Sequence, residues 1–286
     1  RLAGTATGFN RLEWPLGGWA RLRGAGEVTV QPPGGAAVMG RELRPDLIEA
    51  QAALPEEAGP FNPRRPLGYV PIAGHVEYVL DPEWITLGSS WIATPKTYVA
   101  FDGRTAYYQR SRIQFHVTSL DWQESDRVFA GILTALGSPT SAVPVGGHGE
   151  FDGVMLGAFN DPRIEGTFTG DRMRAWDVLW GRGSADVVIE DSYVQVARSS
   201  LVSGDSEINA TGRFSLGYPR RDRGEEIDAR VVMRRRPMAD LRHAFLLDDW
   251  PVDGFVSGEY VLQGNYETPF GSGTLVIDEG VAYGET

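Results

Sequence analysis

The stretch that decides the fold is GTFTGDRMRAW, from Gly166 to Trp176, because the chain carries two closely similar stretches elsewhere. GTATGFNRLEW begins at Gly4, and GTLVIDEGVAYG begins at Gly273. None of the three contains an obvious reactive group. Their glycines permit turns and bulges, their threonines favour strands and their aromatic residues supply apolar surface. The repetition therefore predicts one piece of β-sheet made several times.

The second and third copies align beyond these eleven residues at a constant offset of 107 residues. A second pair of segments, DRVFAGIL at Asp126 and DLRHAFLL at Asp240, repeats in the same order. The repeating unit is about 105–115 residues long, and a period of this length indicates stacked modules. The offset of 162 residues from the first to the second copy then corresponds to one unit plus an insertion. The aligned positions are Gly157, Phe159, Pro162, Gly166, Thr167, Asp171, Ala175 and Trp176 with Gly264, Tyr266, Pro269, Gly273, Thr274, Asp278, Ala282 and Tyr283.

Most segments alternate apolar and polar residues with period two, as strands with one buried face do. Helices are few. Capping signals predict one near 121–136, a counterpart near 237–247 and a candidate over 45–54. The chain is thus predicted to be mainly β, with too little helix to cover the apolar face of its sheet. The domain division is a partial module at 1–40, a Pro-rich insertion at 41–67, a module at 68–180 and another at 181–286.

Composition limits the function. The net charge of −11 argues against a nucleic-acid partner, which needs a basic surface. Cysteine is absent, and no apolar run reaches the roughly 18–20 residues of a membrane span. The chain begins at Arg1 without a signal-like segment, so we expect it to be a fragment of a longer repeat protein whose membrane anchor lies elsewhere.

No catalytic signature is present. The sequence lacks G-x-S-x-G, HExxH and Walker A patterns, and its four histidines lack metal-ligand spacing. We therefore predict a protein that is not an enzyme, with no catalytic residue, no metal site and no cofactor.

Two long segments resemble the repeat of TamB and the wider AsmA-like family. They are GEFDGVMLGAFNDPRIEGTFTGDRMRAWDVLWG from Gly149 and GEYVLQGNYETPFGSGTLVIDEGVAYG from Gly258. Both follow the order G-E-aromatic, Gly, Pro, G-T, then A-W or A-Y-G, and each is preceded by a short helical segment. The resemblance covers most of the chain from about Gly68 onward, together with residues 1–40, while the insertion departs from it.

The resemblance implies repeated antiparallel β modules that form an elongated, folded-over open sheet, or β-taco, with an apolar groove and a few short helices. Such proteins are anchored in the inner membrane of diderm bacteria and cross the periplasm, and they are thought to let phospholipids pass to the outer membrane. The expected partners are phospholipid acyl chains and an outer-membrane β-barrel protein like TamA.

We predict that apolar residues of the alternating segments line this groove. They are Phe115, Phe168, Trp176, Val178, Ile189, Val196, Phe214, Leu216, Ile227, Val231, Leu275 and Ile277.

Three other interpretations remain open at the level of sequence. In the first, the chain is a scaffold or chaperone that pairs its sheet edges with strands of outer-membrane or secreted clients. In the second, it is a structural β-solenoid, although solenoid coils are usually about 20–30 residues long. In the third, it is a closed β-sandwich, a carbohydrate-binding module or enzyme, in which the alternating residues are ordinary core.

Overall fold

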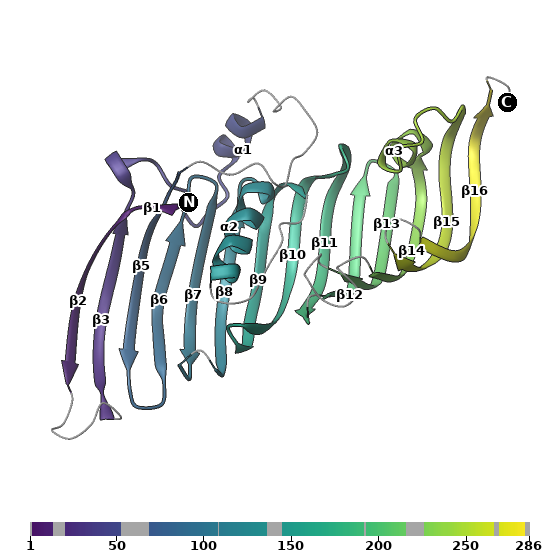
Figure 1. Ribbon diagram of the computed structural model, residues 1–286. Helices are drawn as coiled ribbons and strands as arrows, with labels where there is room; N and C mark the ends of the chain where they lie inside the picture. The colour runs from purple at the N-terminus through teal and green to yellow at the C-terminus, as the bar shows by residue number, and fades with distance from the viewer. Residues whose placement is uncertain are drawn as a thin grey trace.

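The computed structural model describes residues 2–13, 21–52, 69–107, 109–135, 145–191, 193–215, 226–265 and 269–283. The protein is mainly β, as the sequence predicts. Fourteen strands form one antiparallel sheet, and three α-helices are present in the described part of the chain (Figure 1). The helices are α1 (Pro45–Ala52), α2 (Trp122–Ala135) and α3 (Met238–Ala244).

The strands of the large sheet follow one another in space as they do in sequence. This order leaves β2 and β16 as the two edge strands, so the sheet is open and is not closed into a barrel. Two short strands, β1 (Leu2–Ala3) and β4 (Val70–Pro71), pair in parallel outside it. The large sheet consists of β2 (Thr5–Glu13), β3 (Arg23–Gln31), β5 (Ala73–Leu80), β6 (Ile85–Ala93), β7 (Thr97–Thr105), β8 (Ser111–Ser119), β9 (Gly146–Ala158), β10 (Asp161–Ala175), β11 (Val178–Glu190), β12 (Tyr193–Ser203), β13 (Ser206–Ser215), β14 (Glu226–Pro237), β15 (Val252–Asn265) and β16 (Pro269–Ala282).

The two ends of the strands differ in their connections. All three helices lie in connections at the upper end in Figure 1, which we call the helix edge. The opposite end, the hairpin edge, carries short turns such as Phe159–Asn160. From the helix edge, α2 and α3 fold onto the same face of the sheet (Figure 1).

The repeat is visible in the backbone of the hairpins β9–β10 and β15–β16. Four positions with positive φ recur at the 107-residue offset that the sequence shows. The non-glycine members are unusual conformations for L-residues, so their recurrence shows that both hairpins are made in the same way. The pairs are Gly147 (112°) with Gly254 (125°), Gly157 (84°) with Gly264 (93°), Arg172 (51°) with Glu279 (55°), and Trp176 (51°) with Tyr283 (53°).

The helix α3 ends earlier than the periodicity predicts. Leu246 adopts a φ of 57°, its amide donates to the His243 carbonyl, and the Leu247 amide donates to the Arg242 carbonyl at 2.7 Å. These two bonds form a Schellman motif, which usually needs glycine at the position of Leu246. A leucine there gives no sequence signal for the end of the helix, whereas α2 lies within one residue of its predicted bounds at each end.

Candidate functional site

Strand register assigns the side chains to the two faces of the sheet, because directly paired residues of antiparallel strands point to the same side. Followed from strand to strand, the pairing draws one unbroken row across thirteen strands. We call it the hairpin-side row, since it lies toward the hairpin edge. It consists of Asn10, Gly26, Tyr78, Leu87, Gly103, Ile113, Met155, Ile164, Ile189, Val194, Phe214, Ile227 and Gly264.

A second row runs beside the first, two residues closer to the helix edge on most strands. We call it the helix-side row. At the usual strand spacing of about 4.8 Å, the hairpin-side row extends over roughly 58 Å. The helix-side row consists of Ser90, Phe101, Phe115, Gly153, Gly166, Val187, Val196, Gly212, Ala229, Leu262 and Gly271.

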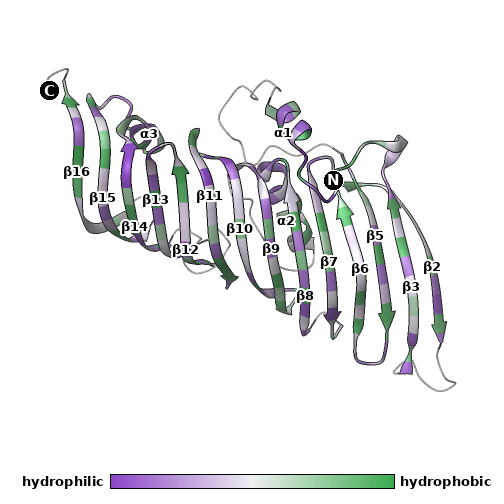
Figure 2. Ribbon diagram, turned by 180° about the vertical axis from the view of Figure 1, so that it is seen from behind, coloured by the Kyte–Doolittle hydropathy of each residue, from purple (hydrophilic) through white to green (hydrophobic). Residues whose placement is uncertain are grey.

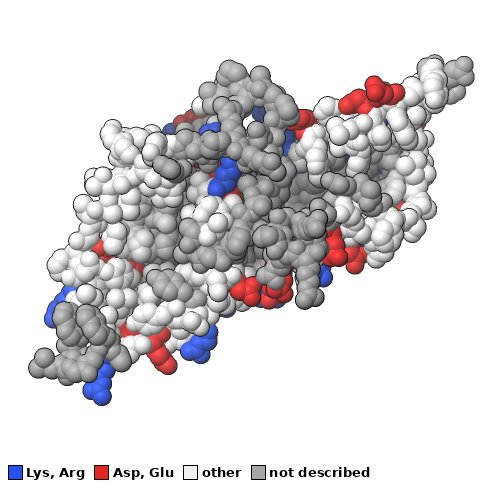
Figure 3. All heavy atoms as spheres, viewed as in Figure 1, with Lys and Arg blue, Asp and Glu red and all other residues white. Residues whose placement is uncertain are grey.

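Neither row contains a charged residue, whereas charged pairs cover the opposite face. Arg198 bonds Asp186 at 2.6 Å and Arg230 bonds Glu259 at 2.8 Å, both across neighbouring strands of that opposite face. Figure 2 shows the resulting alternation of hydrophobic and hydrophilic residues along the strands. In Figure 3, which views the face that bears the helices, the described atoms are mostly uncharged and the charged ones lie mainly toward the margins. The sheet therefore has one apolar face and one polar face.

Glycines on the apolar face let aromatic rings pack directly over the backbone of the sheet, in the space that a Cβ would occupy. A Cβ on Gly166 would stand 2.6 Å from the ring of Phe151, and a Cβ on Gly273 would stand 2.8 Å from the ring of Tyr260. Phe151 also stacks on Phe115, with ring centroids 5.7 Å apart. This contact explains why both repeats combine G-E-aromatic with G-T: the aromatic residue of the first motif covers the glycine of the second. The result is a low-relief apolar surface.

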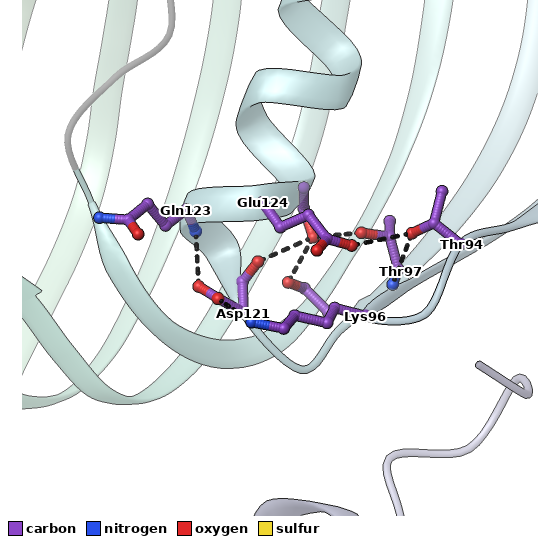
Figure 4. Close-up of polar contacts among 8 residues, drawn as sticks. Thr94, Lys96, Thr97, Asp121, Gln123 and Glu124 are labelled. Atoms are coloured by element: carbon purple, nitrogen blue, oxygen red, sulfur yellow. Dashed lines mark hydrogen bonds and ion pairs between the residues drawn. The ribbon is translucent and has the colours of Figure 1, made fainter. Parts of the chain in front are cut away.

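Polar contacts help to fix the helix α2 to this face, beside the buried side chains of Val128 and Ala130. The Ser125 hydroxyl lies 2.6 Å from the hydroxyls of both Thr97 and Ser119, and all three residues are at most 2% exposed. Lys96 donates to Asp121 at 2.8 Å beside them (Figure 4). The helix adds one aromatic contact to the sheet, between Trp122 and Phe168 at 5.2 Å.

Glu124 belongs to the same polar cluster, where its carboxylate accepts a bond from the Thr94 hydroxyl at 3.2 Å (Figure 4). Burial raises the pKa of Glu124, and the charge of Lys96 opposes that shift. The cluster therefore favours the protonated carboxyl more than water does.

The helix α3 is fixed by a buried arginine and an apolar cluster. Arg236 is 1% exposed, and its guanidinium lies 4.6 Å from the Trp180 ring centroid. It donates to the Leu179 carbonyl at 2.8 Å and pairs with Asp240 of α3 at 2.7 Å. Burial lowers the pKa of Arg236, while Asp240 raises it. The apolar cluster consists of Val178, Trp180 and Ile208 with Ala175, Leu201, Val231, Met233, Leu241 and Ala244.

Most of the groove residues predicted from sequence share the apolar face. Ile189, Phe214 and Ile227 belong to the hairpin-side row, and Phe115 and Val196 belong to the helix-side row. Leu216 lies outside the described residues. The others with side chains on the apolar face are Phe168, Val178, Val231, Leu275 and Ile277.

Two of the predicted residues lie elsewhere than a groove surface. Trp176 occupies the two-residue turn between β10 and β11 with Asp177, where both residues have positive φ, and it is 67% exposed. A two-residue turn with positive φ at both positions is of type I′. It interrupts the apolar–polar alternation from which Trp176 was predicted to line the groove. Val178 is 4% exposed within the α3 cluster, so the helix that follows β14 covers it.

Several members of the rows, such as Met155, Ile164 and Val194, were missed by sequence reasoning. These three residues pair across strands with predicted residues or with each other. Sequence reasoning could find them only if the order of the strands in the sheet were known to equal their order in the sequence. The glycines of the rows carry no hydrophobic signal, and only their contacts with aromatic rings reveal their place.

Other chemistry is sparse in the described residues. Within the ranges that the structure describes, no group of three or more His, Asp or Glu side chains is arranged to hold a metal ion. No described helix has both the length and the apolar character to cross a membrane. No protein-family model, curated protein or solved structure matches this chain.

Proposed function

We propose that the apolar face binds phospholipid acyl chains and that the chain is a segment of a TamB/AsmA-like conduit. In this proposal it carries phospholipids between the inner and outer membranes through the periplasm. A membrane anchor outside this segment and an outer-membrane β-barrel partner belong to the same proposal. The single observation that carries it is the pair of uncharged rows that run without interruption across the sheet.

The energetics of lipid transfer favour such a surface. Exposing an acyl chain to water costs about 0.8 kcal/mol for each CH₂ group. A continuous apolar strip offsets most of this cost at every position along the path, and a headgroup at the sheet margin stays hydrated. A strip of this kind needs no catalytic residue.

The arrangement of the helices supports the same function. No member of either row belongs to the cluster beneath α3, and the Ser125 contacts of α2 lie at the ends of β7 and β8 near the helix edge. These anchoring contacts thus lie near one margin of the apolar face, from which α2 extends inward over the sheet (Figure 1). Lipid would then follow the hairpin-side row, where half-buried residues such as Ile189 and Phe214 form the surface.

Photocrosslinking tests lipid contact at neighbouring positions of one strand. We expect a photoreactive amino acid in place of Ile189 to crosslink to phospholipid in cells. The same residue in place of Val188, whose side chain points to the polar face, should crosslink several-fold less. Equal labelling at both positions, or no bound lipid after extraction of the purified chain, would contradict the proposal.

A charge placed in the row tests transport. Phe214→Asp or Ile227→Arg should impair lipid transport in cells more than folding, because an ion in the strip must be desolvated as each acyl chain passes. Thr211→Asp, on the opposite face of the strand that carries Phe214, is the matched control and should leave transport unchanged. Full activity of the Phe214 and Ile227 variants would show that these positions do not line the path.

A second function is favoured by the edges of the sheet. All nine residues of β2 are exposed, as are most residues of β16, and one side of each strand is unpaired within the sheet. Such edges can accept a client strand, as a scaffold for outer-membrane or secreted proteins would. Crosslinks from Phe9 or Phe270 to a β-barrel protein, with none from Ile189 to lipid, would favour this function.

A further inference from the structure

Three arginines gather at the hairpin edge of β7 and β8. Arg104 and Arg112 are direct cross-strand partners, and Arg110 lies in the turn between the two strands. All three are exposed. In the part of the chain that the structure describes, no carboxylate lies within ion-pair distance of any of them.

This cluster departs from the pattern of the polar face. Like charges directly opposite each other destabilise a sheet. Elsewhere in this acidic chain, cross-strand arginines such as Arg198 and Arg230 face carboxylates. Unpaired guanidinium groups at adjacent positions form a local positive site that an anion would stabilise.

A tryptophan orients two of these guanidinium groups. Arg104 lies 4.8 Å and Arg110 lies 5.4 Å from the ring centroid of Trp84. The attraction of both cations to one ring restrains the two guanidinium groups near each other. The site is therefore organised before any ligand binds.

Hydrogen bonds fix the turn that carries Trp84. The Asp81 carboxylate accepts bonds from the amides of Glu83 and Trp84, both at 2.8 Å. The Tyr107 hydroxyl donates to the Asp81 carbonyl at 2.6 Å and joins this turn to the neighbouring one. The Asp81 carboxylate is thus engaged with the backbone of its own turn.

The cluster lies on the polar face, at the hairpin edge. Gly103 belongs to the hairpin-side row and directly precedes Arg104. Because successive side chains of a strand point to opposite faces, Arg104 and its partner Arg112 point away from the apolar strip. A phosphate group bound by them therefore belongs to a ligand that reaches the polar face at this edge of the sheet.

We infer that Arg104, Arg110 and Arg112, with Trp84 as platform, form a binding site for a phosphate group. The phosphate belongs to a lipid headgroup or to a soluble phosphomonoester. The lipid source rests on the proposed function, whereas the anion site does not.

The test uses three probes and the purified chain. Dihexanoyl phosphatidic acid carries both acyl chains and phosphate, dihexanoylglycerol carries only the chains, and glycerol 3-phosphate carries only the phosphate. The variant Arg104→Gln/Arg110→Gln should bind phosphatidic acid about ten-fold more weakly, since it loses charge-assisted bonds, and should bind dihexanoylglycerol as before. The control Arg182→Gln/Arg198→Gln makes the same change of charge at arginines that pair with Asp171 and Asp186.

The outcomes separate the site from the function. Loss confined to phosphatidic acid establishes a headgroup site. If neither lipid binds the wild-type chain, but glycerol 3-phosphate binds and the cluster variant loses it, the anion site stands for a soluble ligand and the lipid function fails. If the cluster variant binds every probe like the wild type, or if the control loses as much affinity, the site is overturned even where lipid binding persists.

Discussion

The helices α2 and α3 cover the same face of the sheet from the same edge, but they are fixed to it by different chemistry. A hydroxyl cluster and the Lys96–Asp121 pair hold α2, which also buries Val128 and Ala130. A buried arginine over a tryptophan, together with aliphatic side chains, holds α3. The difference teaches that the repeat preserves where a helix covers the sheet and leaves the contacts beneath it free to change.

The largest expected effect is at Arg236. Arg236→Ala removes the contact with Trp180, the bond to the Leu179 carbonyl and the partner of Asp240, and should lower the free energy of unfolding by about 3 kcal/mol. Urea denaturation measures this loss. Arg230→Ala is the control: its pair with Glu259 is largely exposed, so its cost should stay below about 1 kcal/mol. Similar losses in both variants would refute a special role for the buried arginine.

The corresponding substitution beneath α2 is Ser125→Ala. It leaves the buried hydroxyls of Thr97 and Ser119 without their common partner and should cost about 2 kcal/mol in unfolding free energy. Ser184→Ala, at an exposed position of β11, should change stability by less than about 0.5 kcal/mol. If Ser125→Ala proves as mild as this control, the hydroxyl cluster does not hold the helix.

Two tryptophans sharpen the comparison further. The Trp180 indole N–H donates to the Ala175 carbonyl at 3.0 Å, whereas the buried Trp122 indole N–H has no acceptor among the described residues. Trp180→Phe should therefore lower the free energy of unfolding by about 1 kcal/mol more than Trp122→Phe does. The Trp122 variant loses no hydrogen bond and removes a buried N–H group that has no acceptor among the described residues. Thermal denaturation followed by circular dichroism can rank the two variants, and equal costs would contradict this account.

The smallest expected effect is the pH dependence contributed by Glu124. Its folded-state pKa is raised by burial, so its contribution to stability is full below the ordinary carboxyl pKa and is lost as pH rises through the raised value. Glu124→Gln should therefore remove a decline in unfolding free energy that begins above the ordinary carboxyl pKa of about 4.3. Wild-type and variant proteins with parallel stability profiles above this pH would exclude the effect.

Much of the fold follows from local sequence signals. Period-two alternation and glycine-rich turns predict a mainly β structure, and capping residues predict α2, whereas the open sheet was implied only by the family resemblance. The end of α3 could not be predicted, because Leu246 takes a conformation that leucine rarely adopts. The same limit applies at Trp176, where two successive positive φ angles form a turn without glycine.

The candidate site was predictable only in part. Sequence alternation identifies apolar residues such as Ile189 and Phe214, but it gives no information about which residues of distant strands share a row. The bulges that shift register, one of them near Gly181 with a φ of 99°, change the face of all later residues on a strand. Coverage of Val178 by α3 is likewise a tertiary effect that no local pattern reports.

Because the spatial order of the strands equals their order along the chain, nearly every pairing joins neighbours in sequence. Topologies with such local pairing close small loops and fold quickly for their size. Each new hairpin can add to the edge left by the previous one, so the sheet can assemble progressively from one terminus as the polypeptide emerges. The same property lets evolution lengthen or shorten the molecule by whole modules without rebuilding the rest.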